Sequence, residues 1–543
     1  MRSFHYLAFI AVVLVGGALV WRGASHSSTD DEPAQDSSQT RPLTAKSQSF
    51  DSEMHVAEIV EDIAEPDAFY LPEAPSGSIN GDLTLTYRTA AEAKAALRRL
   101  KKAGVGIRGY SDQLNTIRVR ARSESERSAV SRLAGNGAEA GFNFPVSAPP
   151  DPIEGEAGTG TEGFGANAVK WMNTPDNPEL GSGVTVAVID SGISAHDNLD
   201  GSVSNAIRIN GNNVDYGHGT AVASLIAGQS PEAPGVAPGA ELIDIQVLAG
   251  DDGTDAFKLA EAIVAATDAG ANVINLSLGA NGDAGILYEA VKYASANGAI
   301  LVASAGNDAT GALAYPAAYS EVVGVTSIDA NAEPTTFSNF GEGATVAAPG
   351  VGINAAWTDE ELVTFSGTSA SAPLVSGALA ALLSENPGMT STEAVDVLTS
   401  TANDSGAPGY DPYLGAGTVD VGRMLNYDTP GINDVAVADH YIVRDESNLE
   451  AVSVLVTVQN RGTEWANNNT LTVEYEGRTQ DYYLGGLNPG QTASQEILLN
   501  PSTLLSGQPT RIASEIKSTG TEDSSPENNS RVTVISLPPP EGE

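Results

Sequence analysis

One serine in this chain combines small-residue surroundings with a position at the start of a predicted helix. Ser369 lies within Ser366–Pro373, and the apolar run that follows extends to Leu383. Backbone N–H groups and the helix dipole point toward a helix N-terminus, where they can stabilise the oxyanion that forms when a serine attacks a carbonyl. The same pattern is typical of a Ser/Thr cap before a core helix, so partner residues must decide between the two interpretations.

An acid and a histidine precede this serine in the chain. Asp190 follows the β-branched stretch Val184–Ile189, which predicts a buried strand. Open α/β sheets place their functional residues at the carboxyl ends of such strands. His218 lies immediately before a second helical run, Ala221–Ala227. A neutral imidazole can take the proton of a serine hydroxyl while a carboxylate holds its other ring N–H.

Chain order and motif sequence together resemble the subtilisin-like serine proteases (subtilases). The order Asp190, His218, Ser369 is the order that subtilisin itself shows. The resemblance implies a catalytic triad for peptide-bond hydrolysis, with Ser369 as nucleophile, His218 as base and Asp190 as its orienting partner. It covers about residues 166–425 and rests on VAVIDSGI at Val186–Ile193, GHGT at Gly217–Thr220 and GTSASAP at Gly367–Pro373.

A second histidine lies close to the acid in the sequence. His196 resembles a recurrent histidine that follows the Asp motif in this family, and we interpret it as structural. Ala221 stands where the family commonly has a further histidine. That position lies outside the triad, so the departure implies no loss of activity.

The resemblance also assigns an oxyanion hole and a substrate-binding edge. Asn307, after a predicted strand, would donate its side-chain amide together with the Ser369 backbone N–H, although a Gly-Asn pair elsewhere is usually a turn. Ala314 is placed at the base of the pocket for the residue before the scissile bond, which predicts an apolar or aromatic preference. An extended peptide would add main-chain hydrogen bonds to the edge. The residues assigned to substrate binding are Ser277, Leu278, Gly279, Ser304, Ala305, Gly306 and Ala314.

Composition bounds the class of protein. The 543 residues are enough for roughly three or four domains at about 150 residues each. Cysteine is absent, which excludes disulfides and thiolate metal sites. The net charge of −42 argues against nucleic-acid binding, which needs a basic face. It favours solubility, and fits saline surroundings or cationic partners equally well.

The N-terminal third of the chain reads as a leader, a tether and a small domain. Residues 1–22 contain the uncharged run Tyr6–Trp21 and predict a signal peptide or a membrane anchor. Residues 23–81 are acidic and low in apolar residues, which is typical of a disordered linker. Residues 82–147 predict strand, helix, strand, helix, strand, a split βαβ arrangement. Residues 148–165, rich in Pro and Gly, form a linker with the expected processing site.

The position of the small domain resembles that of a subtilase propeptide, which implies a folding aid and an inhibitor of its own enzyme.

Charged residues are unevenly distributed between the small domain and the region that follows it. Residues 83–135 carry twelve bases and four acids, whereas residues 160–425 carry five bases and 31 acids. This predicts electrostatic docking between the two units, or two unrelated solvated surfaces.

Residues 166–427 alternate strands and helices, which predicts an α/β catalytic domain with a doubly wound, mainly parallel sheet. Residues 432–537 carry short alternating strands between Asn, Gly and Pro turns, an all-β sandwich resembling CARDB-like immunoglobulin-like modules. That module could bind a surface or substrate, or act as a spacer. Residues 538–543 are an expected disordered tail. Calcium is possible, as in many subtilases, but its ligands are unassigned even though Asp251 and Asp252 lie in an acidic loop.

Together these features predict an exported serine endopeptidase made as a zymogen, with protein substrates, its own propeptide as inhibitor and no required cofactor. The competing class is a surface-adhesion protein whose protease unit is inactive. An esterase with the same triad is a lesser alternative, because the expected edge at Ser277 favours peptides.

Overall fold

The computed structural model describes residues 70–147, 162–210, 217–248, 253–444, 452–500, 509–520 and 522–535. The predicted leader, most of both linkers, the C-terminal tail and the acidic loop with Asp251 and Asp252 lie outside these ranges. Within the described ranges, no helix has the length and apolar character that crossing a membrane requires.

Residues 82–142 form a four-stranded antiparallel sheet, in the order β2-β3-β1-β4, covered by two helices. Each helix begins with a capping box, Thr89 with Glu92 and Ser123 with Glu126. Strand β2 is additional to the three predicted strands, because the glycines in its six residues weaken the strand pattern. The elements are β1 (Asp82–Tyr87), α1 (Ala90–Lys102), β2 (Gly106–Ser111), β3 (Thr116–Arg120), α2 (Glu124–Ala134) and β4 (Ala138–Phe142).

Both expected linkers are ordered at one end. Leu71 packs against the core of the small domain, and the Arg127 guanidinium donates to the Pro72 carbonyl at 2.8 Å. Phe164 is buried in the core of the catalytic domain, and its backbone N–H donates to the Val351 carbonyl. The low apolar content of these linkers hides such single anchoring residues from sequence analysis.

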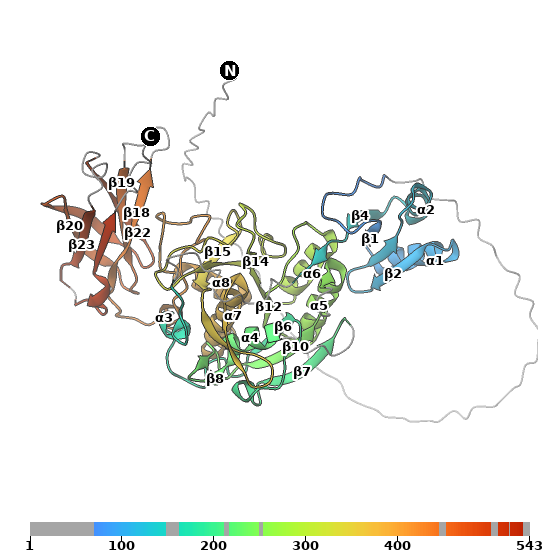
Figure 1. Cartoon of the computed structure of the whole chain (residues 1–543), viewed down its shortest axis with the longest axis horizontal. Helices are drawn as coiled ribbons and strands as arrows, with labels where there is room; N and C mark the ends of the chain where they lie inside the picture. The colour runs from blue at the N-terminus through green and yellow to red at the C-terminus, as the bar shows by residue number, and fades with distance from the viewer. Residues whose placement is uncertain are drawn as a thin grey trace, which may run out of the picture. The chain divides into compact units, whose positions relative to one another are not determined.

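The catalytic domain is built on a seven-stranded parallel sheet, in the order β15-β14-β13-β12-β6-β10-β7. Strand β6 is the point from which the chain adds strands on both sides, which confirms the predicted doubly wound fold (Figure 1). Such a reversal of strand order marks the ligand-binding edge of open α/β sheets. The strands are β6 (Thr185–Asp190), β7 (Val203–Arg208), β10 (Glu241–Gln246), β12 (Val273–Leu276), β13 (Ile300–Ser304), β14 (Val322–Ile328) and β15 (Ala344–Pro349).

Side chains of β6 alternate between two cores. Val186 and Val188 join the core with α4 and α7, whereas Ala187 and Ile189 join the core with α5 and α6. Strand residues that are apolar on both faces explain the continuous β-branched run. The helices are α3 (Ala168–Trp171), η1 (Asp197–Leu199), α4 (Gly217–Ala227), α5 (Ala256–Asp268), α6 (Gly285–Ala296), α7 (Thr368–Glu385), α8 (Ser391–Ser400) and α9 (Val421–Leu425).

Short strands complete the two N-terminal domains. They are β5 (Pro145–Val146), which pairs with β11 (Thr254–Asp255), β8 (Gln229–Ser230) with β9 (Ala233–Pro234), and β16 (Ile353–Ala356) with β17 (Leu362–Phe365).

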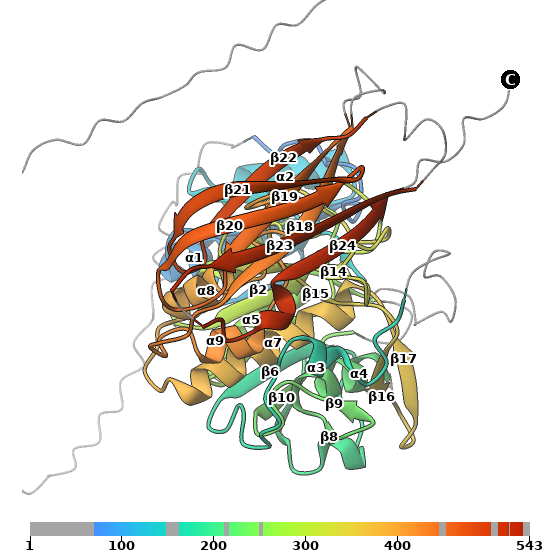
Figure 2. The ribbon, with the colours of Figure 1, turned by 90° about the vertical axis from the view of Figure 1, so that its left-hand side faces the viewer.

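The C-terminal domain is a sandwich of a three-stranded and a four-stranded antiparallel sheet, β18-β19-β22 and β21-β20-β23-β24, as the sequence predicts (Figure 2). Inward-facing residues such as Val454, Val456 and Leu471 fill the space between the sheets. Its elements are β18 (Val435–Arg444), β19 (Val452–Asn460), β20 (Ala466–Tyr475), β21 (Arg478–Leu487), β22 (Thr492–Leu498), β23 (Thr510–Ser518), η3 (Pro526–Asn528) and β24 (Ser530–Ile535).

Buried polar groups join the sandwich to the catalytic domain. Gln459 of β19 donates to the Ala402 carbonyl at 3.0 Å and accepts from the Asp404 backbone N–H at 3.1 Å. Arg423 of α9 donates to the Arg461 carbonyl at 3.1 Å. Because Gln459 is 3% exposed, these hydrogen bonds are shielded from water.

Candidate active site

Asp190 and His218 form a buried hydrogen-bonded pair. Asp190 is the last residue of β6 and His218 is the second residue of α4. His218 Nδ1 lies 2.8 Å from Asp190 Oδ1, and the nitrogen is the donor because an ionised carboxylate only accepts. This bond fixes the tautomer with the proton on Nδ1, so Nε2 is left as the basic nitrogen.

The loop after Asp190 holds the start of α4 in place. The Gly219 backbone N–H donates to Ser191 Oγ at 3.0 Å. A side-chain carbon at position 219 would overlap the Gly192 carbonyl oxygen, so only glycine allows this approach. The Phe365 and His218 rings pack edge to face, with centroids 5.2 Å apart. The imidazole therefore has one fixed orientation.

Ser369 is buried at the start of α7. Its hydroxyl donates to the Ser277 carbonyl at 3.3 Å. Within the described residues His218 Nε2 has no hydrogen-bond partner. The structure therefore pairs Asp190 with His218, whereas the Ser369 hydroxyl is bonded to the expected substrate edge and not to His218. A nucleophile–base hydrogen bond is often long or absent before substrate binds.

Asn307 is oriented by a residue that the sequence analysis did not single out. Its Oδ1 accepts from the Thr368 backbone N–H at 3.0 Å and from Thr368 Oγ1 at 2.8 Å. Both lone-pair directions of the amide oxygen are thus used, and Nδ2 remains as the donor. A side-chain carbon at Gly367 would lie 3.0 Å from that Nδ2. Thr368 is adjacent to Ser369, which is the signal that could have found it.

The expected substrate edge is formed by the segments that follow β12 and β13. Ala280 and Tyr315 exchange backbone hydrogen bonds of 2.8 Å, and the Ala314 N–H donates to the Ala305 carbonyl at 2.8 Å. A side-chain carbon on Gly279 would lie 3.0 Å from Ala314, and one on Gly306 would lie 3.4 Å from it. Ala314 thus lies beside both glycines, and its role as the base of a substrate pocket stays a prediction.

Two of the assigned substrate residues can contribute only their backbones. The side chains of Leu278 and Ala305 belong to the core with α5 and α6. Ser277 and Ser304 are also buried, at 0% and 6% exposure. The sequence could not show which residues bind substrate through the backbone and which through the side chain, because a motif match assigns a position at the edge but not the direction of its side chain.

His196 lies in a separate set of contacts. Its Nδ1 accepts from the Asn198 backbone N–H at 3.0 Å, which caps η1, and its Nε2 lies 3.2 Å from the Glu361 carbonyl. Both ring nitrogens are therefore occupied by backbone groups.

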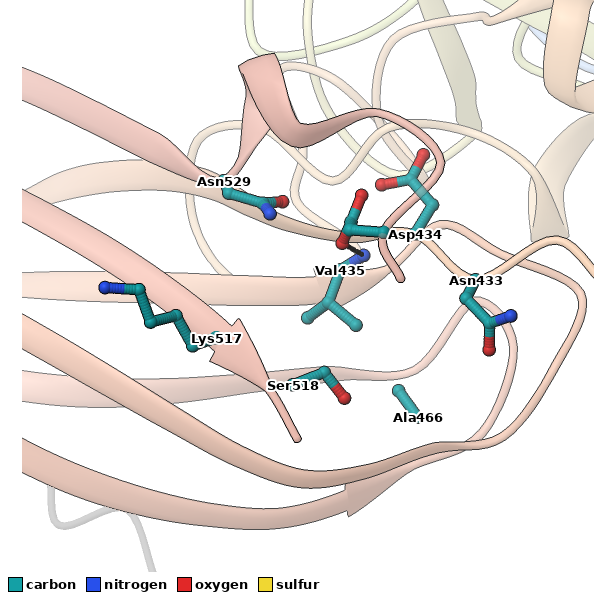
Figure 3. Close-up of a pocket in the computed structure, with 8 residues that line it drawn as sticks. Asn433, Asp434, Val435, Ala466, Lys517, Ser518 and Asn529 are labelled. Atoms are coloured by element: carbon teal, nitrogen blue, oxygen red, sulfur yellow. Dashed lines mark hydrogen bonds between the residues drawn. The ribbon is translucent and has the colours of Figure 1, made fainter. Parts of the chain in front are cut away.

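A small cavity of about 100 Å³ lies in the sandwich domain (Figure 3). Asp523 accepts from the Val435 backbone N–H at 3.1 Å, and the Asn528 amide donates to Asp434 at 3.0 Å. Because its acidic groups already bind backbone and side-chain donors, we assign this cavity a structural role. Across the described ranges, no three His, Cys, Asp or Glu side chains form a group that could hold a metal ion.

Comparison with known proteins places this site in a family. The Subtilase family model matches residues 181–417. Subtilisin Savinase of Lederbergia lenta is 35% identical over 231 residues, which are 42% of this chain and 86% of that protein. The Alkaline protease of Shouchella clausii is 35% identical, and the match spans 42% of this chain and 61% of that protein.

A solved structure shares the fold. The keratinolytic enzyme fervidolysin from Fervidobacterium pennivorans, related to subtilisin, aligns with a TM-score of 0.57 at 20% identity, over 87% of this chain and 79% of its own. The CARDB-like resemblance of the sandwich remains a prediction. The structural match shows a shared fold. The sequence matches show that this chain belongs to the subtilase family of serine endopeptidases.

Proposed function

We propose that the chain is an exported subtilisin-like endopeptidase made as a zymogen, which cuts proteins through Asp190, His218 and Ser369. The observation that carries the proposal is the buried 2.8 Å hydrogen bond between His218 and Asp190. It lies at the carboxyl edge of the sheet, where the carbonyl of Ser277 accepts from the Ser369 hydroxyl. An adhesion protein with an inactive protease unit would not need this set of groups.

In the proposed mechanism, the Ser369 hydroxyl turns toward His218 Nε2 and attacks the scissile carbonyl as the imidazole takes its proton. Asp190 stabilises the resulting imidazolium. The amide of Asn307 and the Ser369 backbone N–H donate to the oxyanion. His218 then protonates the leaving amine, and water releases the acyl group by the same steps.

Asn307→Ala tests the oxyanion assignment. We expect wild type to cut casein at internal bonds, and the variant to lose about 10²–10³-fold in kcat, the range that this type of change causes in subtilisin itself. KM should change little, because the donor acts on charge that develops in the transition state.

Thr368→Val is the matched variant: it keeps Asn307 and removes the Oγ1 donor that orients it. An intermediate loss of kcat is expected. Full activity in Asn307→Ala would disprove the assignment, and a wild-type chain that leaves casein intact would disprove the function.

We propose further that residues 82–147 inhibit the enzyme before release, as in related propeptides. In support, Ser147 and Gly279 exchange antiparallel backbone hydrogen bonds of 3.3 and 3.4 Å at the expected substrate edge. Arg118 bridges Asp82 of the small domain and Asp255 of the catalytic domain, at 2.7 and 3.0 Å. The Arg118–Asp255 contact joins a base of the basic unit to an acid of the acidic unit, which supports electrostatic docking between them.

Packing of the Phe257 ring against Gly109, called the aromatic seat below, supports the same contact between the small domain and the catalytic domain. The Phe257 backbone N–H, at the start of α5, donates to Asn143 Oδ1 at 3.0 Å. A side-chain carbon at Gly109 would lie 2.7 Å from the Phe257 ring, so the ring fits only against a glycine.

Gly109→Val should therefore weaken inhibition by the cleaved small domain about tenfold, because overpacking costs 1–3 kcal/mol and tenfold corresponds to about 1.4 kcal/mol. Dilution of freshly processed enzyme, with activity followed over time, measures the change. Gly106→Val is the control on the same strand, since a side-chain carbon there has ordinary spacing, 3.7 Å from Arg120. Equal effects in both variants would contradict the role of the seat.

Export is proposed from the uncharged run Tyr6–Trp21, and one relative, the Minor extracellular protease Epr of Bacillus subtilis, is named as extracellular. That relative is 33% identical over 44% of this chain and 38% of its own length. A calcium requirement stays a prediction without assigned ligands.

A further inference from the structure

A second buried carboxylate lies beside the Asp190–His218 pair. Asp244 is on β10, where it pairs with Val188 of β6, while Gln246 pairs with Asp190. Paired residues of neighbouring strands share a face, and so do residues two apart in one strand. Asp190 and Asp244 therefore project from the same face of the sheet, and they are 0% and 2% exposed.

One arginine pairs with this second carboxylate. Arg208 is the last residue of β7, and its Nη2 lies 2.7 Å from Asp244 Oδ2. Its Nη1 also donates to the Asp244 carbonyl at 3.4 Å. Residues 160–425 carry only five bases against 31 acids, so this base is one of few available to the catalytic domain.

Asp244 is close enough to the catalytic loop to act on it. A side-chain carbon at Gly192 would lie 3.9 Å from Asp244 Oδ1, and the Ile193 backbone N–H is directed at the carboxylate. Burial raises the pKa of Asp244, whereas the hydrogen bond and charge of Arg208 lower it, and the charge of Asp190 raises it. Asp244 thus lies within the field of Asp190.

Few other charges face this region from the described elements around it. Helix α4, strand β12 and strands β16 and β17 contain no acid or base other than His218, and α7 has only Glu385 at its far end. At the start of η1, the Asp197 backbone N–H and Nδ1 of the preceding His196 lie against the carboxylate of Glu360. Arg208 and Asp244 are therefore the balancing charges next to the pair.

We propose that Arg208 neutralises Asp244, and that this ion pair sets the pH range over which His218 acts as the base. The inference rests on the proposed roles of Asp190 and His218. Arg208 and Asp244 do not touch the substrate; they are positioning residues that act through the field at Asp190 and His218. Because Arg208 is positive and Asp244 is negative, removing one of them changes the net charge near His218 in a direction that can be stated in advance.

The test is the acid limb of the kcat/KM profile against pH, measured on a short chromogenic peptide with full-length chains allowed to mature. Arg208→Met removes the charge that balances Asp244. Above the raised pKa of Asp244 the remaining negative charge favours the imidazolium, so the limb moves to higher pH. Asp244→Asn leaves an unbalanced positive charge, so the limb moves to lower pH. Each shift is expected to be about half a pH unit to one pH unit, because the Arg208 side chain is 35% exposed and solvent screens part of its charge. The double variant returns to the wild-type position.

Arg208→Lys is the matched control, because it keeps the charge and should keep the wild-type limb. Opposite shifts that cancel in the double variant support the inference. A loss of kcat with an unmoved limb shows a merely structural pair and overturns it. If Arg208→Met does not fold, an unmoved limb in the isosteric Asp244→Asn overturns it alone. Activity in His218→Ala would instead defeat the proposed function.

Discussion

Ser369→Ala is expected to abolish casein hydrolysis and to leave the chain at full length. The substitution removes the proposed nucleophile but keeps the start of α7, whose backbone N–H groups remain in place. In subtilisin itself, loss of the serine costs about 10⁶-fold in kcat, and the oxyanion donors retain a residual rate. Intact mass together with casein hydrolysis measures both properties on one purified sample.

The outcome for the N-terminal unit separates two routes of maturation. If wild type loses residues before the catalytic domain and Ser369→Ala does not, the chain processes itself. If the variant is inert but still processed, a second protease cuts within the linker of residues 148–165. Undiminished casein hydrolysis by the variant would show that Ser369 is not the nucleophile.

His218→Ala should lower kcat by a similar factor, about 10⁶-fold, because serine and base act as one unit in subtilisin. The double variant with Ser369→Ala should therefore be no less active than either single variant. His218 is 2% exposed and contacts the Phe365 ring, so its folding is checked by a thermal melt. A melt close to wild type assigns the loss to catalysis.

His196→Ala is the matched control for a histidine close to the catalytic acid. It removes the cap of η1, and loss of such a cap costs about 1 kcal/mol of stability. The expected result is a lower melting temperature with kcat within a few-fold of wild type. A collapse of kcat in a folded His196→Ala protein would reverse the two assignments.

Local patterns carried most of the fold from sequence to structure. The β-branched run before Asp190 became the central strand, because strands buried on both faces have no polar alternation to confuse them. Thr390 and Glu393 form a capping box, a pattern that the sequence shows directly because both groups lie within one turn of helix. The alternating segments of the C-terminal domain form its two sheets, because alternation of apolar and polar residues is a property of each strand by itself.

Pairings between distant positions were not predictable. Arg208 and Asp244 meet because β7 and β10 are neighbours in the sheet, an order that chain alternation does not specify. The fit of Phe257 against Gly109 joins two domains whose docking no periodicity encodes. For Thr368 the motif gave the position, but its two bonds to Asn307 depend on a loop from another strand.

The segment that joins the catalytic domain to the sandwich bears on whether other copies of the enzyme can cleave the chain there. An endopeptidase digests extended, accessible chain, and a loose hinge between its domains would be its nearest target. Here the Thr463 and Glu464 N–H groups donate to the Ile432 carbonyl, and the Gly431 N–H donates to the Glu464 carboxylate at 2.7 Å. The backbone that links the domains is thus occupied by the sandwich itself. Residues held in this way are not free to lie as an extended strand in another molecule's cleft, and we expect this to limit autolysis at the junction.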